Sequence, residues 1–359
     1  MEITSSLGNA FAMCQTTVLS VESNIGDGNF DYEFSLNFRG RHVLLQHYGN
    51  GNSYRWTPIE PGIYTLSVAV KLNGQTYETV TETVEVVSNG QTVLSGIDVS
   101  FWQSYIDWKA VKNSGIQYAM LRVGYGRESN QKDTRFEEFY TNALANDIPV
   151  GVYHYSYADS VADAVVEAKN CLSMLNGRPL TLPVAYDIED ASQSWMSKQM
   201  LTDVAIAFCE EIRAAGYQPM IYCNTNFSKN RLDMARLREK GYDIWIASYG
   251  VSDYGHPYPV KMWQYTSDGS VAGINGRVDM NYWYVGAEHD GDAALPEGQK
   301  GYCNADTVNV RNSPNYGTIL YTANTGYTFT VLEKSGVWYR VAFGGGRYGW
   351  IHQDYVTLM

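Results

Sequence analysis

The sequence lacks the cysteine and histidine spacing that marks a zinc site or a disulfide framework. Its five cysteines are odd in number, they stand far apart, and no two of them form a Cys-x-x-Cys motif. The six histidines form no His-rich cluster, so zinc is not expected. Cys209 falls in a helical pattern and Cys223 in a strand pattern, and both are expected to be buried free thiols.

Long apolar runs and an excess of positive charge are also missing. No run of about 18 apolar residues occurs, so we expect no membrane insertion. Acidic residues outnumber basic ones by 38 to 26, a net charge of −12, which argues against nucleic acid as a partner. The first residues show no basic segment followed by an apolar core, so a signal peptide is either absent or already removed.

Aromatic residues, by contrast, are abundant, with 29 tyrosines and 9 tryptophans among 359 residues. Many of these tyrosines are expected in strands, because a tyrosine ring suits a half-buried pleated surface. Exposed aromatic rings would also suit a carbohydrate partner. The length of the chain predicts two or three domains.

The residue pattern changes along the chain and predicts these domains. Residues 1–92 alternate apolar and polar positions between Gly and Asn turns, which predicts an antiparallel β-sandwich. Residues 93–288 alternate eight strand patterns with five helix patterns, and only short connections fit between the last three strands, which predicts an incomplete, flattened parallel barrel. Residues 289–301 are polar and predict a linker, and residues 302–359 predict a small all-β domain.

The most informative motif is the Asp187-Ile188-Glu189 run, which follows the apolar residues 182–186. Side chains two apart on a strand point to the same face, with their Cα atoms roughly 6–7 Å apart. Two carboxyl groups would therefore converge at a strand end. One could donate a proton while the other stabilises developing positive charge. The alternative is a solvated acidic turn, since Asp190 extends the run.

Carboxylates stand at the ends of three predicted barrel strands, where such barrels carry their active sites. Asp98 lies near the end of the first strand, Asp187 and Glu189 end the fourth, and Asp279 lies in the last. A shared acidic site is therefore expected, with a divalent metal on the four acids as the competing interpretation. Residues near the same strand ends predict a sugar-binding surface: Tyr153, Tyr155, Tyr222, Trp245, Trp263 and Gln264. His154 is expected to be a packed, hydrogen-bonded histidine rather than a base.

Six strand motifs in the central segment resemble those of glycoside hydrolase family 25, the lysozyme-type muramidases. They occur in the right order at residues 96–100, 122–126, 151–155, 187–189, 263–265 and 278–281. The resemblance implies a flattened (β/α)5(β)3 barrel that needs no cofactor. It also implies cleavage of the β-1,4 bond between N-acetylmuramic acid and N-acetylglucosamine in the peptidoglycan glycan strand.

The same resemblance implies roles for the four acids. Glu189 resembles the general acid, and Asp187 resembles the carboxylate that stabilises the charged intermediate. Asp98 and Asp279 resemble two further active-site acids. Retention of configuration is implied, with the substrate's own acetamido group as the nucleophile, although direct attack by Asp187 stays open. We expect burial and neighbouring acids to raise the pKa of Glu189.

The two flanking segments carry weaker resemblances. Residues 302–359 resemble bacterial Src-homology-3-like (SH3-like) wall-binding domains through the motifs at 308–314 and 349–351, which implies binding to the stem peptide or cross-bridge of peptidoglycan. Residues 1–92 resemble immunoglobulin-like modules of wall proteins. The chain is thus expected to act on the bacterial cell wall, as a phage endolysin released from the cytoplasm or as a secreted enzyme.

Two alternatives to a muramidase stay open. One is a non-catalytic wall-binding protein, although the intact pair of Asp187 and Glu189 argues against it. The other is a hydrolase of another amino-sugar polymer such as chitin. Related chitinases carry an acidic D-x-x-D-x-D-x-E run, whereas Leu182 and Ala185 stand here in place of its first two acids.

Overall fold

The structure, a computed structural model, describes most of the chain. The described residues are 1–22, 29–90, 92–251, 254, 260–285, 299–311, 314, 319–343 and 347–359. Most of the predicted linker, residues 289–298, lies outside them. The predicted domain boundaries therefore stay predictions. Among the described residues, no helix has the length and apolar character needed to cross a membrane.

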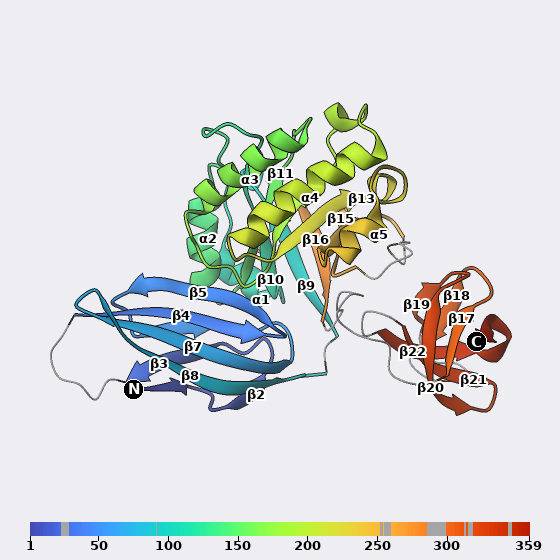
Figure 1. Cartoon of the computed structure of the whole chain (residues 1–359), viewed down its shortest axis with the longest axis horizontal. Helices are drawn as coiled ribbons and strands as arrows, with labels where there is room; N and C mark the ends of the chain where they lie inside the picture. Colours follow the sequence, from blue (N-terminus) through green and yellow to red (C-terminus); the bar gives the residue numbers. More distant parts are fainter. Residues whose placement is uncertain are drawn as a thin grey trace.

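The N-terminal part forms two sheets around a shared apolar core (Figure 1). Alternating buried and exposed positions, as in the strand at residues 62–72, turn one face of each sheet inward. The three-stranded sheet has the order β1 (Glu2–Ser5), β3 (Thr17–Glu22) and β6 (Ser53–Trp56). The five-stranded sheet has the order β2 (Ala10–Ala12), β8 (Gln75–Val87), β7 (Gly62–Leu72), β4 (Phe30–Phe38) and β5 (Arg41–Gly49).

The central part is a closed barrel of eight strands. In chain order they are β9 (Val93–Val99), β10 (Tyr118–Tyr125), β11 (Val150–Tyr155), β12 (Val184–Asp187), β13 (Pro219–Asn224), β14 (Asp243–Ala247), β15 (Met262–Gly269) and β16 (Val278–Tyr284). Helices follow the first five strands: α1 (Trp108–Asn113), α2 (Phe136–Ala145), α3 (Val161–Leu175), α4 (Lys198–Ala214) and α5 (Met234–Glu239). Short helical turns η1 (Ala191–Gln193) and η2 (Phe227–Arg231) extend two of the strand-to-helix connections.

One feature of the barrel differs from the prediction of parallel strands. The last strand, β16, is antiparallel to both of its neighbours, β15 and β9. Parallel strands need a crossover of about a dozen residues or more, and only eight residues, 270–277, separate β15 from β16. The short connection therefore returns the chain in the opposite direction, and the barrel closes without a final helix.

Alternation along the strands assigns each side chain to the barrel interior or to the outer core under the helices. Ile97 and Val99 pack in the outer core, whereas Tyr118 and Met120 fill the interior. Gly96 is required here, because a Cβ atom at this position would lie 2.3 Å from the ring of Tyr118. Asp98 shares the interior face of β9 with Gly96, one layer nearer the carboxyl ends of the parallel strands.

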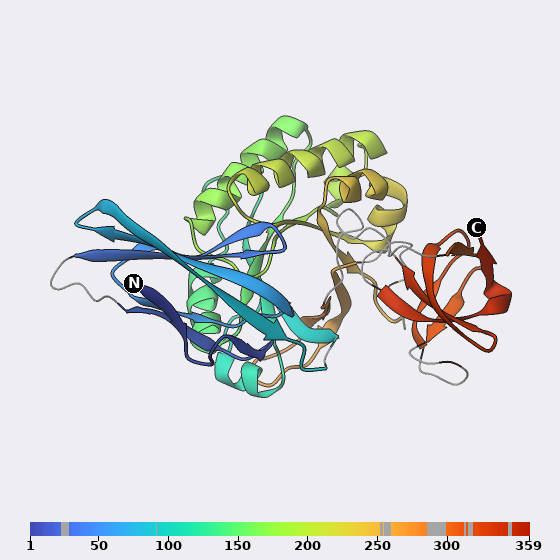
Figure 2. The same ribbon diagram turned by 60° about the horizontal axis from the view of Figure 1, so that its bottom comes forward.

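The C-terminal part is a separate small unit with its own core, built around residues such as Val310, Phe329 and Ile351. In both views it lies on the far side of the molecule from the N-terminal sandwich (Figures 1 and 2). Its strand order is β19 (Ile319–Ala323), β18 (Val308–Arg311), β22 (Arg347–His352), β21 (Trp338–Phe343), β20 (Thr328–Ser335), β17 (Lys300–Cys303) and β23 (Val356–Leu358), with the turn η3 (Gln353–Tyr355) before β23.

The sandwich packs directly against the end of the barrel where the parallel strands begin. One apolar cluster joins Trp56 and Tyr64 of the sandwich to Trp283 of the barrel. Beside it, Lys261 forms an ion pair with Glu60, and both side chains are under 10% exposed. A second, more exposed ion pair joins Arg55 to Asp147 at 2.6 Å. The sandwich is therefore a fixed part of the barrel unit.

Replacing Lys261 with methionine is expected to destabilise the protein by about 3 kcal/mol, because the substitution leaves Glu60 buried without its nearest cation. This loss of stability is at the low end for breaking a buried ion pair, because Arg39 lies 3.6 Å from the other oxygen of Glu60 and still provides a positive charge. Denaturant unfolding measures the change. The matched control is Arg55→Met, which removes an exposed pair and should cost under about 1 kcal/mol. Equal losses in the two variants would contradict this account of the interface.

Candidate active site

The four predicted acids meet at the carboxyl end of the barrel. Asp98 and Asp279 are direct partners in the register of β9 and β16. Asp187 ends β12, and Glu189 follows it by two residues. The pKa of each of these acids is influenced by at least one of the others, and that of Asp187 is influenced by both Glu189 and Asp98. The strand ends therefore bring four carboxyl groups into one site.

Asp98 is the centre of a buried hydrogen-bond network. Its Oδ2 atom accepts from the side-chain amides of Gln264 and Asn281, each at 2.8 Å. Burial, followed by the charge of Asp279, raises the pKa of Asp98 well above its ordinary value. The hydrogen bond between the two carboxyl groups raises the pKa of Asp98 and lowers that of Asp279, although burial still raises the latter overall. Two buried carboxyl groups this close favour a state in which the pair holds one proton between them.

Asp187 carries the least compensated carboxyl group of the site. It is only 6% exposed, and its Oδ1 atom has no hydrogen-bond partner among the described residues. Burial raises its pKa well above the ordinary value, Glu189 and Asp98 add to this rise, and Arg122 acts against it. The Oδ1 atom of Asp187 can therefore accept a hydrogen bond from a bound ligand, and its carboxylate can stabilise a nearby positive charge.

Glu189 is partly buried and receives a hydrogen bond from the side-chain amide of Asn224 at 2.9 Å. Burial raises the pKa of Glu189 above its ordinary value of 4.5, the hydrogen bonds from Asn224 oppose this, and Asp279 and Asp190 add to it. A carboxyl group with this direction of shift can keep its proton at a higher pH than a free glutamic acid.

Two of the predicted aromatic residues reach the site surface and two lie beneath it. Tyr153 and Tyr155 are partly exposed, and the Tyr155 hydroxyl donates to Asp190 at 2.8 Å. Tyr222 and Trp245 are buried. Tyr222 donates to Gln264 at 2.8 Å, and Trp245 donates to Asn281 at 2.9 Å. The side-chain amides of Gln264 and Asn281 in turn donate to Asp98. Tyr222 and Trp245 therefore hold in place the two amides that bind Asp98.

Trp263 does not face the site, which corrects its prediction as a substrate-binding residue. Its ring is 7% exposed, it packs in the outer core, and its Nε1 atom donates to the Ser248 carbonyl at 2.8 Å. The physical reason is strand alternation: the next residue, Gln264, points inward to Asp98, so Trp263 must point outward. His154 is fully buried, with its Nε2 atom 2.9 Å from the Gly126 carbonyl, in line with its expected packing role.

The structure also places residues at the site that sequence reasoning missed. Asn224 donates a hydrogen bond to Glu189, and Asn281 donates one to Asp98. Their positions on strands β13 and β16 were the available signals, together with the motif at residues 278–281 for Asn281. Exposed rings stand on the loops that follow the barrel strands. The loop residues Trp102, Tyr157 and Trp195 are 74%, 49% and 63% exposed. Loops have no periodicity, so only their position after a strand could have identified them.

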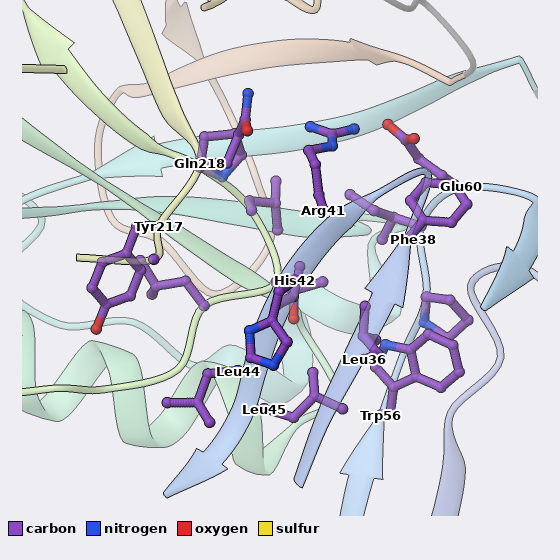
Figure 3. A pocket seen from close by; sticks show the side chains of 18 of the residues that line it. Leu36, Phe38, Arg41, His42, Leu44, Leu45, Trp56, Glu60, Tyr217 and Gln218 are labelled. Atoms are coloured by element: carbon purple, nitrogen blue, oxygen red, sulfur yellow. The ribbon is translucent and has the colours of Figure 1, made fainter. Parts of the chain in front are cut away.

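In the part of the chain that the structure describes, neither a metal-ligand cluster nor the cavity between the sandwich and the barrel belongs to this acidic site. Among the described residues, no group of three or more His, Cys, Asp or Glu side chains could hold a metal ion. A cavity of about 840 Å³ lies at the opposite end of the barrel, between the sandwich and the strand starts. Figure 3 shows Trp56 and Glu60 of the sandwich on one side of it and Tyr217 and Gln218 of the barrel on the other.

Comparison with known proteins assigns both domains to families. Residues 97–274 match the model of glycosyl hydrolases family 25, and residues 306–357 match that of the bacterial SH3 domain. The autolytic lysozyme of Clostridium acetobutylicum is 28% identical over 215 residues, which is 60% of this chain and 63% of that protein. The chain therefore spans less than two thirds of that relative's length.

Two further similarities complete the comparison. The uncharacterized protein YegX of Escherichia coli O157:H7 is 30% identical over 196 residues, which is 52% of this chain and 68% of that protein. The crystal structure of the bacterial lysozyme from Streptomyces coelicolor has 27% sequence identity and a TM-score of 0.46, covering 53% of this chain and 91% of that one. The predicted family resemblance is confirmed: the chain belongs to glycosyl hydrolases family 25 and carries a bacterial SH3 domain after its barrel.

Proposed function

We propose that this chain is a peptidoglycan hydrolase, a 1,4-β-N-acetylmuramidase that cleaves between N-acetylmuramic acid and N-acetylglucosamine. The observation that carries the proposal is the burial of Glu189 beside three further acids at the carboxyl end of the barrel. Membership of glycosyl hydrolases family 25 and the similarity to an autolytic lysozyme support it.

In this proposal Glu189 protonates the glycosidic oxygen, because burial helps it to keep a proton. Asp187 stabilises positive charge at the sugar, either as the nucleophile or by orienting the acetamido group of the substrate. Asp98 and Asp279 share a proton and limit the negative charge near Glu189. The exposed rings of Trp102, Tyr157, Trp195 and Tyr249 provide stacking surfaces for the glycan, as Tyr153 and Tyr155 do nearer the acids.

Reducing-sugar release from two polymers tests the proposal against its alternatives. Purified peptidoglycan and chitin are incubated separately with the protein, and new reducing ends are measured. Release from peptidoglycan alone is expected. Release from chitin at a similar rate would favour the amino-sugar hydrolase alternative, and binding to walls without release would favour a non-catalytic wall-binding protein.

Replacing Asn224 with aspartate is expected to move the alkaline limb of the pH–rate profile to higher pH. The substitution removes the hydrogen-bond donor that stabilises the Glu189 carboxylate and adds a negative charge beside it, and both effects raise the pKa of Glu189. The Asp side chain keeps an acceptor for the backbone amides of Asn226 and Phe227. The exposed variant Asn230→Asp has the same change in net charge and should leave the profile unmoved. A shift to lower pH in Asn224→Asp would contradict the role of Glu189.

We further propose the finer features of the fold and of the partners. The barrel is a flattened (β/α)5(β)3 barrel, and the N-terminal sheets form an immunoglobulin-like sandwich. The C-terminal domain holds the chain on the wall by binding the stem peptide or cross-bridge. The protein acts on the bacterial wall, as a phage endolysin or as a secreted enzyme.

Removing residues 302–359 is expected to lower the rate on intact walls by up to about 10²-fold at low enzyme concentration, because tethering raises the effective substrate concentration. The rate on soluble glycan fragments should stay the same, which serves as the internal control. Turbidity loss of walls and reducing-end release from fragments provide the two readouts. Equal losses on both substrates would show that the domain supports the barrel rather than anchoring it.

A further inference from the structure

Arg122 lies in the wall of the acidic site, although its charge has no role in the proposed reaction. Met120, two positions earlier on β10, packs in the barrel interior. Alternation places Arg122 on the same interior face, one layer nearer the carboxyl end, and its register partner is Tyr153 on the next strand. The Arg122 charge acts on Asp187, whose pKa it lowers against the larger, opposite effect of burial. Arg122 and Asp187 therefore face the same part of the site.

The Arg122 guanidinium is held in one orientation and keeps a donor free. Its Nε atom donates to Asp133 at 2.7 Å, and Asp133 is fixed in turn by backbone amides of Phe101 and Arg135. The guanidinium carbon lies 4.8 Å from the centre of the Phe101 ring and 5.5 Å from that of Tyr125. Its Nη2 atom is buried and has no hydrogen-bond partner among the described residues. A buried, unpartnered donor of this kind is costly unless a ligand satisfies it.

Asp187 offers the complementary group. Its buried Oδ1 atom is an acceptor without a hydrogen-bond partner in the described part of the chain. The site thus presents one fixed donor and one fixed acceptor that are not bonded to each other. A secondary amide fits this pair, because it has one N–H group and one carbonyl oxygen on adjacent atoms.

We propose that Arg122 is a specificity-determining residue that binds the carbonyl oxygen of a secondary amide on the muramic acid residue while Asp187 accepts its N–H group. This inference rests on the proposed muramidase function and names the group that the site recognises. Two amides of peptidoglycan have the required chemistry: the acetamido group at C2, and the amide that joins the lactyl group to the stem peptide. Phe101, whose ring lies beside the guanidinium, also contacts the exposed ring of Trp102, with the ring centres 4.4 Å apart and the planes tilted by 32°.

Binding measurements in the full chain with Glu189→Gln, which is expected to slow cleavage strongly, test the proposal. Titration calorimetry compares Arg122 with Arg122→Met and Arg122→Lys on three sugars. The first is a peptidoglycan tetrasaccharide with stem peptides, the second is the same sugar after N-deacetylation, and the third is N-acetylchitotetraose, which has no lactyl group. Loss of Arg122 should weaken binding of the first sugar roughly 10- to 100-fold, with partial rescue by lysine.

The second and third sugars distinguish the two amides. If the acetamido group is the ligand, the Arg122→Met effect disappears on the deacetylated sugar and persists on chitotetraose. If the lactyl amide is the ligand, the effect persists on the deacetylated sugar and disappears on chitotetraose. Equal losses on all three sugars, or no loss on the first, would overturn the inference, since a merely structural role of Arg122 cannot depend on the amide.

Two controls separate this inference from folding and from the proposed function. Arg127→Met removes an exposed arginine that pairs with Asp163, and it should leave all three affinities unchanged. Comparing sugars within one variant cancels any general loss of folded protein, which melting temperatures also measure. If the chain with Arg122 intact bound none of the sugars, the muramidase proposal would fall, and this inference with it.

Discussion

Substituting Glu189 with glutamine is expected to lower kcat on peptidoglycan by about 10²- to 10⁴-fold, the usual contribution of a general acid. Glutamine keeps the shape of the side chain and can still bond to Asn224, which donates to Glu189 at 2.9 Å. It has no proton of suitable pKa to give to the glycosidic oxygen. Steady-state release of reducing ends measures the loss, and substrate binding should change little.

The matched control for this variant is Glu239→Gln, the same chemical change at an exposed position at the end of α5. Its activity should equal that of the unmodified chain. A Glu189→Gln variant that kept more than about a tenth of the activity would contradict the assignment of Glu189 as the general acid.

Substituting Asp187 with asparagine is expected to separate activity from stability. The rate should fall by about 10²- to 10³-fold, because the site loses the negative charge that stabilises the developing cation. The free energy of unfolding at neutral pH should rise by about 1 kcal/mol, because Asp187 is a buried carboxylate with an unpartnered oxygen. Enzyme kinetics and denaturant unfolding of the same preparation measure both effects.

The pH dependence of this stability difference has a definite sign. The folded-state pKa of Asp187 is raised above its ordinary value of 3.8, so the folded state binds the proton more tightly than the unfolded state. The destabilisation is absent below about pH 3.8 and grows as the pH rises toward the folded-state pKa. The Asp187→Asn variant should therefore match the unmodified chain in stability below about pH 3.8 and exceed it by a growing margin as the pH rises toward the folded-state pKa of Asp187. A gain that was the same at every pH would show that ionisation of Asp187 is not its cause, and a loss at neutral pH would show that the carboxylate is compensated in the folded state.

The acidic site could be predicted from the sequence because strand order alone fixes where strand ends meet. Asp98, Asp187 and Asp279 lie on strands of one barrel, so closure of the barrel brings them together whatever the details of packing. The direction of the last strand does not change this result, because Asp279 aligns with Asp98 even though β16 is antiparallel.

The roles of the surrounding side chains were harder to predict, because they depend on which face of a strand each residue occupies. Trp263 and Gln264 are neighbours in the sequence, yet only Gln264 reaches Asp98. A shift of one residue in the assumed alternation exchanges an interior side chain for an outer one. Contacts between segments far apart in the chain, such as Glu60 with Lys261, leave no local signal at all.

The identity of the new reducing ends tests the central claim most directly. Purified peptidoglycan is digested with the protein, the products are reduced with borohydride, and the reduced sugars are identified by mass spectrometry. A muramidase leaves reduced muramic acid ends, and these should be absent after treatment with Glu189→Gln. Reduced glucosamine ends would show that a different bond is cut, and the proposed reaction at the four acids would be wrong.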